Sequence, residues 1–309
     1  PASGLDHERR QVGLHAHNRW LADWCADLPG RRAGLAQIFP NDVDAAVAEI
    51  HWAKENGLNG ILFSAIPPDA GVPALWDPIY DPVWAAAQET GLPINQHGGA
   101  GIPEIEGAPG DDPASGLIFL MEVPFFANRS LWHLIVGGVF ERFPGLKFVM
   151  TEQAVGWVPD VLARMDTYWG LMTNVGRVGE MPADQDLIPH PPSTYFQRNC
   201  WMGASMPSPD EAAAIKKLGI DKVMWGSDYP HREGTYPYTL ESLRYSFHDW
   251  DEGDLRKLLA GTAAAIYDLD LAPLEELPIG PMVADVAQPL DEKPTDTFSM
   301  AFSPRRLTT

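Results

Sequence analysis

The sequence predicts an α/β fold organised around a parallel β-sheet, and two observations support this prediction. Short apolar segments alternate with amphipathic helical segments from residue 6 to residue 267, which is the pattern of strand–helix–strand units with right-handed crossovers. In the segment KVMWGSDYPH, residues 222–231, an apolar run ends at Gly226 and a burst of polar residues follows. The loops after parallel strands form the active face of such folds. Both a doubly wound sheet and part of a (β/α)8 barrel fit the pattern.

The first helix and the first strand precede a capped second helix. Apolar residues recur among polar ones over 6–27, and Pro29-Gly30 would end that helix. The run RAGLAQIF at 32–39 is expected to form a strand. Asn41-Asp42 is a typical helix start and Gly57 a typical helix end. These signals predict a helix–strand–helix order at the start of the chain.

A second strand–helix–strand unit follows. GILFS at 60–64 predicts a strand, and a loop rich in Pro and Gly covers 67–78. Asp81-Pro82 is expected to supply the N-cap and first residue of a helix that ends at Gly91. The strand expected over 92–96 leads straight into a histidine and two glycines.

The middle of the chain is expected to hold a long loop and three regular elements. Residues 100–126 exceed an ordinary connection, so we expect a lid or a substrate loop there. Apolar spacing then predicts a helix over 128–143, and KFVMT predicts a strand over 147–151. A helix is expected over 157–167, and residues 170–192 are expected to be irregular.

The last third supplies the final two predicted strands. Ser208-Pro209 is a typical helix start, and Gly219 a typical end. The pattern predicts strands over 196–202 and 222–225 and closing helices over 239–250 and 254–267. We expect a barrel domain over residues 1–271 and a C-terminal tail, wrapped on the surface or disordered, over residues 272–309.

Composition limits the possible partners and the compartment. The 309 residues carry a formal net charge of -20, which repels phosphate backbones and anionic lipids, so neither nucleic acid nor a membrane is expected as a partner. The two cysteines, Cys25 and Cys200, are far apart and form no CxxC pair, which indicates free thiols in a reducing compartment such as the cytoplasm. A small-molecule substrate is the expected partner.

Ionisable residues follow three of the predicted strands. His97, Glu152 and Asp228 stand at strand exits, and His231 lies three residues beyond Asp228. Parallel strands bring these exits to one face, where an imidazole and carboxylates could hold a divalent ion such as zinc, manganese or iron. Such an ion acidifies a bound water or polarises a carbonyl. The sequence therefore predicts a metal site on this face.

Each residue also has a purely structural interpretation. His97 could be a core histidine bonded to the backbone, Glu152 and Asp228 could cap helices, and His231 could be a turn residue. The pair His15-Ala16-His17 falls in a helical segment where positions i and i+2 face different sides, so we expect no ligand role for it. The glycines at 98–101 lack dinucleotide-binding or Walker spacing.

Six motifs together resemble the amidohydrolase-related family, the branch of the amidohydrolase superfamily that contains aminocarboxymuconate-semialdehyde and resorcylate decarboxylases. In chain order they are HNRWLADWC, RRAGLAQIF, DPIYDPVWAAAQETGLPINQHGG, FERFPGLKFVMTE, VMWGSDYPH and LLAGTAAAIYDLD. The resemblance implies a distorted (β/α)8 barrel with one divalent metal, usually zinc or manganese. By this resemblance His97 matches the metal-binding histidine after the fifth strand. Asp228 matches the aspartate after the eighth strand, which binds metal or handles the proton.

Two departures from the family pattern shape the expectation. The sixth-strand histidine of the characterised decarboxylases is Glu152 here, which argues against decarboxylation. The segment that resembles the family's YNxWL helix begins at His17, so the first two strands and their ligand pair are expected to be missing. Six strands in an incompletely closed barrel would leave open edges that favour association, so a homo-oligomer is possible.

The resulting functional expectation is a metal-dependent, amidohydrolase-like hydrolase. The substrate would be a small organic acid, amide, ester or lactone, attacked by a metal-activated water with Asp228 as ligand and general base. Zinc is the expected ion. One alternative is a nonoxidative decarboxylase on the same scaffold. The other is an inactive or partial barrel with a binding or structural role.

Overall fold

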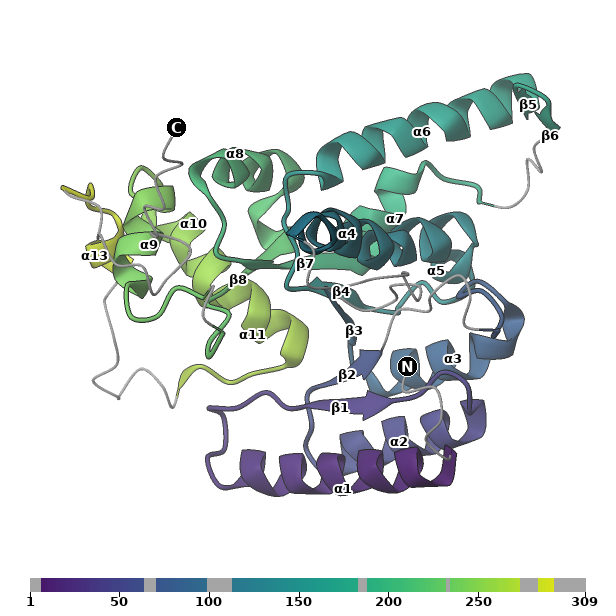
Figure 1. The fold of residues 1–309 in the computed structure, drawn as a ribbon, viewed down its shortest axis with the longest axis horizontal. Coiled ribbons are helices and arrows are strands. Elements are labelled where there is room, and N and C mark those ends of the chain that lie inside the picture. The colour runs from purple at the N-terminus through teal and green to yellow at the C-terminus, as the bar shows by residue number, and fades with distance from the viewer. Residues whose placement is uncertain are drawn as a thin grey trace.

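A computed structural model describes residues 7–63, 71–98, 113–182, 188–231, 234–272 and 283–291. Its centre is a six-stranded, fully parallel sheet (Figure 1). The strands occur in the order β1, β2, β3, β4, β7, β8, so sequence neighbours are also neighbours in space. They span β1 Leu35–Ile38, β2 Gly60–Phe63, β3 Ile94–His97, β4 Phe148–Thr151, β7 Cys200–Ser205 and β8 Val223–Gly226. The predicted α/β class and its six strands are confirmed.

Helices connect the strands. They are α1 His7–Ala26, α2 Val43–Glu55, α3 Asp81–Thr90, α4 Pro113–Val136, α5 Val139–Arg142, α6 Val158–Val175, α7 Pro192–Asn199, α8 Pro209–Leu218, α9 Thr239–Phe247, α10 Glu252–Arg256, α11 Thr262–Tyr267 and α13 Val283–Val286. Short 3-10 turns cover Pro78–Tyr80 and Ile220–Lys222, and a π-helical stretch covers Lys257–Gly261. None of the described helices is both long enough and apolar enough to span a bilayer.

The helix ends follow the local chemistry of the sequence. The Asp42 side chain accepts a hydrogen bond of 3.0 Å from the backbone N–H of Ala45 at the start of α2. Ser208 and Glu211 form a reciprocal capping box at the start of α8. Gly91 ends α3 with a φ of 71°, a left-handed conformation that costs glycine little. Asp81, expected as an N-cap, is instead the first residue of α3, because the preceding 3-10 turn already continues into the helix.

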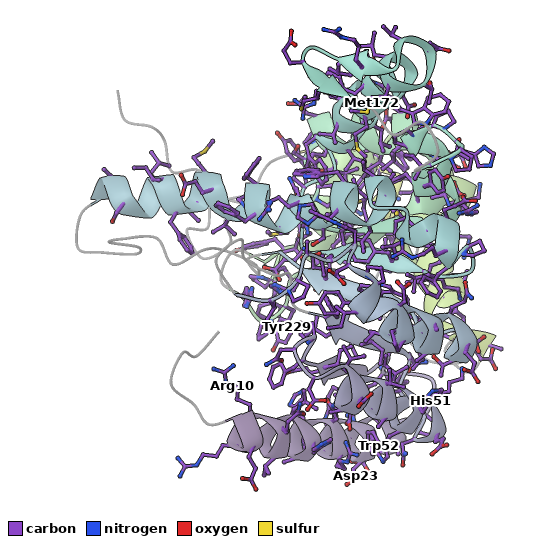
Figure 2. The ribbon with its side chains drawn as sticks, turned by 90° about the vertical axis from the view of Figure 1, so that its right-hand side faces the viewer. Arg10, Asp23, His51, Trp52, Met172 and Tyr229 are labelled. Atoms are coloured by element: carbon purple, nitrogen blue, oxygen red, sulfur yellow. The ribbon has the colours of Figure 1, made fainter. Side chains whose placement is uncertain are left out.

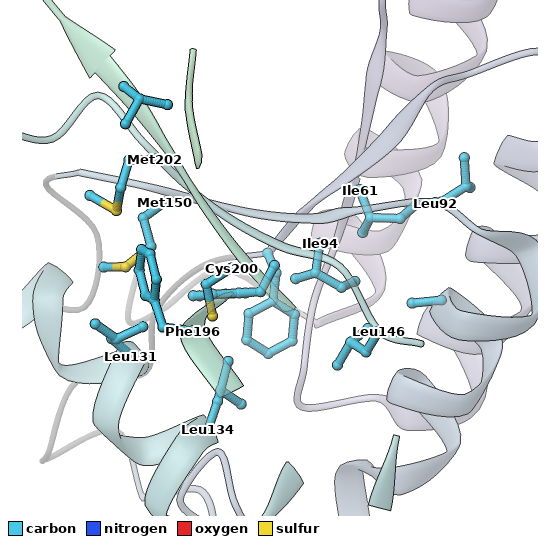
Figure 3. Packing of buried hydrophobic residues seen from close by; sticks show 14 of the residues in the cluster. Ile61, Leu92, Ile94, Leu131, Leu134, Leu146, Met150, Phe196, Cys200 and Met202 are labelled. Carbon is cyan, nitrogen blue, oxygen red and sulfur yellow. The ribbon is translucent and has the colours of Figure 1, made fainter. Parts of the chain in front are cut away.

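The two faces of the sheet have different coverings. Alternate strand residues point to opposite faces, and one set packs with the helices in the main core (Figure 3). Figure 3 shows Met150, Cys200 and Met202 of this set near Leu131 of α4. The intervening residues belong to a smaller cluster in which α11 contributes Ile266; the strand members are Val149 and Met224. Helix α11 therefore packs against the face opposite the main core.

The prediction of a loop over residues 100–126 is wrong for residues 113–126, the part of this segment that the structure describes. Helix α4 begins at Pro113 and runs through this region to Val136. Its sequence contains Gly116 and Pro124, both unfavourable inside helices, which is why the pattern resembled a loop. The single helix expected over 128–143 is also interrupted, because Gly138 adopts a φ of 71° between α4 and α5.

Two further expectations around the fifth predicted strand need correction. Residues 192–199 form α7, and the strand begins only at Cys200 and continues to Ser205. Phe196 is fully buried in the main core, as a strand residue would be, so its apolar character did not distinguish the two states. Residues 170–175 continue α6, and an antiparallel hairpin of β5 Arg177–Val178 and β6 Met181–Pro182 follows at its far end (Figure 1).

Part of the C-terminal region packs against the barrel-type domain. The helix α13 packs against α9 and α10, with Val286 buried in the main core and the Asp285 carbonyl accepting a 2.6 Å hydrogen bond from Arg244. Residues 273–282 and 292–309 of the expected tail lie outside the described residues. Cys25 and Cys200 are free and buried, and burial raises the pKa of both thiols.

Within the described residues the sheet is not closed into a ring. The strands β1 and β8 stand at its two ends and do not pair with each other. A closed barrel requires its first and last strands to hydrogen-bond. The observed sheet thus corresponds to six consecutive strands of a barrel-type architecture, as the sequence predicts. All six C-terminal ends face the same way, which positions the site described next.

Candidate active site

The site lies where β3, β4 and β8 end. His97 is the last residue of β3 and pairs in register with Thr151, the last residue of β4. Ser205 of β7 pairs with Gly226, the last residue of β8. Because the strands are parallel and aligned at these ends, the residues that follow them meet at one edge of the sheet.

The ends of β3 and β4 lie close together, and there His97 contacts Glu152. The Nε2 atom of His97 contacts Oε2 of Glu152. Gly98 donates a 2.8 Å hydrogen bond to the Thr151 carbonyl. A Cβ placed on Gly98 would lie 2.4 Å from the Glu152 carbonyl oxygen, a distance that real Cβ atoms do not show. Glycine is therefore required here for the backbones to approach this closely.

A second pair comes from the loop after β8. His231 Nδ1 lies 3.2 Å from Oδ1 and 3.3 Å from Oδ2 of Asp228. The Asp228 side chain is only 8% exposed, whereas His231 is half exposed. The loop turns back on itself, since the His231 N–H donates to the Asp228 carbonyl at 2.9 Å and Thr235 N–H donates to the Ser227 carbonyl at 2.9 Å.

The two pairs are joined through Glu152. Its Oε1 lies 3.8 Å from His231 Nδ1. Ligand atoms of Glu152, Asp228 and His231 all lie within 4.8 Å of one another, and His97 touches Glu152 from the other side. The structure therefore brings all four predicted residues into one connected cluster.

The donor set of this cluster fits a divalent cation. Two carboxylates and an imidazole are the ligand types that zinc, manganese and iron share. Clustered carboxylates without a counter-ion would repel one another, and the neighbouring imidazoles relieve this only when protonated. The residues present thus suit a metal ion, and Glu152, Asp228 and His231 each offer one potential ligand atom, all within 4.8 Å of one another.

Backbone strain marks the same edge of the sheet. Glu152 and Asp228 adopt φ angles of 54° and 59°, and Met206, directly after β7, has a φ of 50°. Non-glycine residues rarely occupy this left-handed region, and such residues concentrate at functional sites. Among the described residues, only Asp268 shares this conformation away from the strand exits. Both acidic residues of the cluster therefore adopt this strained conformation just after β4 and β8 end.

The remaining histidine pair lies elsewhere. His15 and His17 are in α1, as expected from the helical pattern. His15 Nδ1 lies 2.7 Å from Oε2 of the buried Glu49 on α2, and His17 packs against Trp20. Of the glycines at 98–101, only Gly98 falls within the described residues.

Sequence reasoning did not single out Gln153, Tyr229 and Tyr236. Gln153 follows Glu152 directly and is 6% exposed, and among the described residues neither its side-chain amide nitrogen nor its amide oxygen has a hydrogen-bond partner. Tyr229 and Tyr236 form an edge-on pair with ring centroids 5.6 Å apart, and both are more than half exposed on the loop that carries Asp228. The only feature of the sequence that could have indicated these three residues is their position near the predicted site residues.

Comparison with known proteins finds decarboxylases to which the chain is similar over most of its length. It is 26% identical over 276 residues to the gamma-resorcylate decarboxylase of Rhodococcus jostii strain RHA1, covering 82% of this chain and 75% of that protein. The 5-carboxyvanillate decarboxylase of Sphingomonas paucimobilis superposes with a TM-score of 0.71 at 27% identity, covering 87% of this chain and 77% of that one.

A third similarity concerns the fold alone. The 5-carboxyvanillate decarboxylase of Novosphingobium aromaticivorans, solved with bound manganese and 3-methoxy-4-hydroxy-5-nitrobenzoic acid, superposes with a TM-score of 0.68 at 22% identity. The alignment covers 85% of this chain and 73% of that one. The sequence profile described as amidohydrolase matches residues 4–269, which is most of the chain. The chain therefore belongs to the amidohydrolase family of enzymes.

Proposed function

We propose that this protein is a nonoxidative decarboxylase of a small, hydroxylated aromatic carboxylic acid. The observation that carries the proposal is the buried Asp228 carboxyl at a strand exit, paired with the half-exposed His231. It is supported by the two decarboxylases at 26% and 27% identity, which align with most of this chain. Decarboxylation was the alternative expectation from the sequence.

The hydrolase expected first from the sequence finds less support. It rested on Glu152 standing where the characterised decarboxylases have a histidine. Glu152 nevertheless lies in the same cluster as His97, Asp228 and His231. A carboxylate at this position can still bind a divalent ion, so the substitution does not by itself argue for hydrolysis.

A divalent ion held by the Glu152 and Asp228 carboxylates, with His97 beside Glu152, would orient an anionic substrate and offset its charge. His231 would then carry protons rather than bind the ion. Manganese and zinc both accept this donor set. Two neighbouring structures with the same fold contain manganese. Zinc, the ion expected from the sequence, is therefore one of two candidates, and a metal titration separates them.

The protein groups can supply the proton that decarboxylation needs. Asp228, in its protonated form, gives a proton to the ring carbon that bears the carboxylate. The bond from that carbon to the carboxylate then breaks, carbon dioxide leaves, and the bonding electrons return to the ring. A carboxyl group has two oxygens, so Asp228 can offer one to the ion and hold the proton on the other. His231 is half exposed and within 3.3 Å of both oxygens, so it can return a proton from solvent.

The edge-on pair of Tyr229 and Tyr236 supports an aromatic substrate. Both rings lie on the loop of Asp228 and are more than half exposed. Aromatic rings favour offset or edge-on contacts with one another. An aromatic acid whose carboxylate faces the cluster could therefore pack its ring against this pair.

The test is to incubate the purified chain with 2,6-dihydroxybenzoate or 5-carboxyvanillate, each carrying a carbon-13 carboxyl group. The reactions contain either manganese or zinc. Labelled carbon dioxide and the decarboxylated phenol are the expected products, and Asp228→Asn should slow the formation of both about 100- to 10,000-fold. Hydrolysis of phenyl esters or lactones without release of carbon dioxide would support the hydrolase instead. No turnover with any of these, despite bound metal, would support a binding role.

A further inference from the structure

We propose that Gln153 is a specificity-determining residue whose side-chain amide hydrogen-bonds to a ring hydroxyl of the substrate; this inference rests on the proposed function. Gln153 directly follows Glu152 beyond the end of β4. Its backbone N–H donates a 3.3 Å hydrogen bond to the carbonyl of Gly203 on β7. The residue is therefore held at the strand ends, beside the cluster of His97, Glu152, Asp228 and His231.

The side chain of Gln153 lies next to the contact between His97 and Glu152. A Cβ placed on Gly98 would lie 3.4 Å from Cγ of Gln153, and Gly98 directly follows His97. Gln153 is only 6% exposed, whereas the side chains of His97 and Glu152 are 47% and 30% exposed. A covered amide therefore lies beside two side chains that a ligand can reach.

Gln153 differs from the other buried amide side chains in the part of the chain that the structure describes. Its Nε2 and Oε1 atoms are both buried, and neither has a hydrogen-bond partner among those residues. Each of the other buried amides makes at least one side-chain hydrogen bond: Asn18, Asn95, Gln96 and Asn199. An unpaired buried amide destabilises a fold, so packing alone would favour an apolar residue at position 153.

The amide of Gln153 can turn without losing a hydrogen bond. A glutamine side chain has three rotatable bonds, and no hydrogen bond to the described residues holds this one in place. Rotation towards the cluster would exchange an unpaired buried amide for one that is bonded to a ligand. Binding of a suitable ligand would therefore remove the desolvation penalty of the free amide.

A ring hydroxyl matches the hydrogen-bonding capacity of this amide. A glutamine amide donates through its nitrogen and accepts through its oxygen, and a phenolic hydroxyl can both accept and donate in return. With the substrate carboxylate at the cluster, a hydroxyl on the adjacent ring carbon would lie at the edge of the cluster, where Gln153 is. An analogue without the hydroxyl would leave the buried amide unpaired. Gln153 would thus select hydroxylated aromatic acids over unsubstituted ones.

The loop after β8 limits where the ring of the ligand would lie. In Figure 2 the labelled Tyr229 of this loop lies on the left side of the molecule, opposite His51 of α2. Tyr229 forms an edge-on pair with Tyr236. The strand order places β7 between β4, which precedes Gln153, and β8, which precedes the tyrosines. A ligand that contacts both Gln153 and the tyrosine pair would therefore lie across the end of β7.

The experiment measures ligand binding to the full chain in the presence of manganese by isothermal titration. One probe is 2-nitroresorcinol, whose nitro group replaces the carboxylate so that no carbon dioxide can leave. The other is 1,3-difluoro-2-nitrobenzene, in which fluorine replaces both hydroxyls. Gln153→Met keeps an unbranched side chain of similar length but removes the amide. It should weaken binding of 2-nitroresorcinol about 10- to 100-fold and leave binding of the difluoro probe unchanged.

A thermal melt without ligand separates substrate recognition from a structural role. Removal of an unpaired buried amide should raise the melting temperature of Gln153→Met by about 2–4 °C, whereas loss of a structural contact would lower it. The matched control is Gln197→Met on α7, whose amide donates a 3.0 Å hydrogen bond to the Leu218 carbonyl. This control should not raise the melting temperature, and it should leave the affinity for both probes unchanged.

The outcomes distinguish this inference from the proposed function. Equal affinity of Gln153→Met and the unsubstituted chain for 2-nitroresorcinol would overturn the role of Gln153. A lower melting temperature with equal losses for both probes, or no binding of 2-nitroresorcinol by the unsubstituted chain, would also overturn it. Selective loss of 2-nitroresorcinol binding, in a chain that releases no carbon dioxide from 2,6-dihydroxybenzoate, would support Gln153 and reject decarboxylation alone.

Discussion

The Nδ1 atom of His231 lies 3.2 Å and 3.3 Å from the two carboxylate oxygens of Asp228. Asp228 is nearly enclosed, whereas His231 is half exposed. The pair therefore connects a sheltered acid to solvent through one imidazole. This arrangement supports general acid chemistry at the end of β8.

Replacing Asp228 by Asn should lower kcat about 100- to 10,000-fold, because general acid catalysis contributes on this scale. The amide keeps the size of the side chain but cannot give up a proton to carbon. The matched control is Asp160→Asn on α6, an exposed carboxylate that should leave kcat unchanged. Carbon dioxide release measures both. An Asp228→Asn enzyme with unchanged kcat would contradict the assigned role.

His231→Gln should slow turnover less than Asp228→Asn and should alter its pH profile. The amide can still hydrogen-bond to Asp228 but cannot carry a proton from solvent. We expect kcat to fall about 10- to 100-fold and the limb of the pH–rate profile that depends on the imidazole to disappear. A purely structural residue would change the rate without removing that limb.

Glu152→Gln should weaken metal binding about 10- to 100-fold, the scale on which changes around a metal site act. It removes one carboxylate from the three residues whose potential ligand atoms lie within 4.8 Å of one another. Isothermal titration with manganese and with zinc measures the affinity. The comparison variant is His15→Ala with His17→Ala, because neither histidine lies at the strand ends. Loss of metal from this double variant would instead restore the histidine pair as ligands.

Gly98→Ala should destabilise the fold by about 1–3 kcal/mol, the usual cost of overpacking. The new methyl group would lie 2.4 Å from the Glu152 carbonyl oxygen, so the ends of β3 and β4 would have to separate. Gly13→Ala is the control, since nothing lies within 4 Å of its position in α1. The control should gain up to about 1 kcal/mol from helix propensity. Urea denaturation measures both changes.

His133 should make stability fall as the pH drops below about 6.5. Burial, with a smaller effect from Arg129, lowers the pKa of His133 from 6.5 to about 4. Between these values the unfolded chain binds a proton that the folded chain does not, so acid favours unfolding. The effect begins near pH 6.5 and is complete below about pH 4. His133→Gln should therefore lose less stability than the unsubstituted protein between pH 7 and pH 5, measured by urea denaturation.

Elements whose signals are local were predicted well from the sequence. Asp42 and Ser208 begin helices where expected, and Gly91 ends one. The alternation of apolar runs and helices gave the parallel sheet and its six strands. These features depend on a few neighbouring residues. A helix cap or an amphipathic repeat is defined by residues within a short stretch of the chain.

Elements that depend on distant partners were predicted less well. Phe196 is apolar in either state, and only its packing in the main core placed it in α7 rather than in a strand. The first half of α4 resembled a loop because Gly116 and Pro124 disfavour a helix, although the structure shows a helix from Pro113 onward. Tertiary contacts override weak local preferences.

The sequence by itself determined which residue types stand at the strand exits, namely His97, Glu152, Asp228 and the following His231. Strand ends could be located because apolar runs stop there. Only the tertiary structure decided that Glu152 touches His97 on one side and approaches His231 on the other. That contact depends on left-handed turns at Glu152 and Asp228 and on the close approach of Gly98 to the end of β4. Such backbone geometry arises from the pairing of strands far apart in the chain, so no local pattern encodes it.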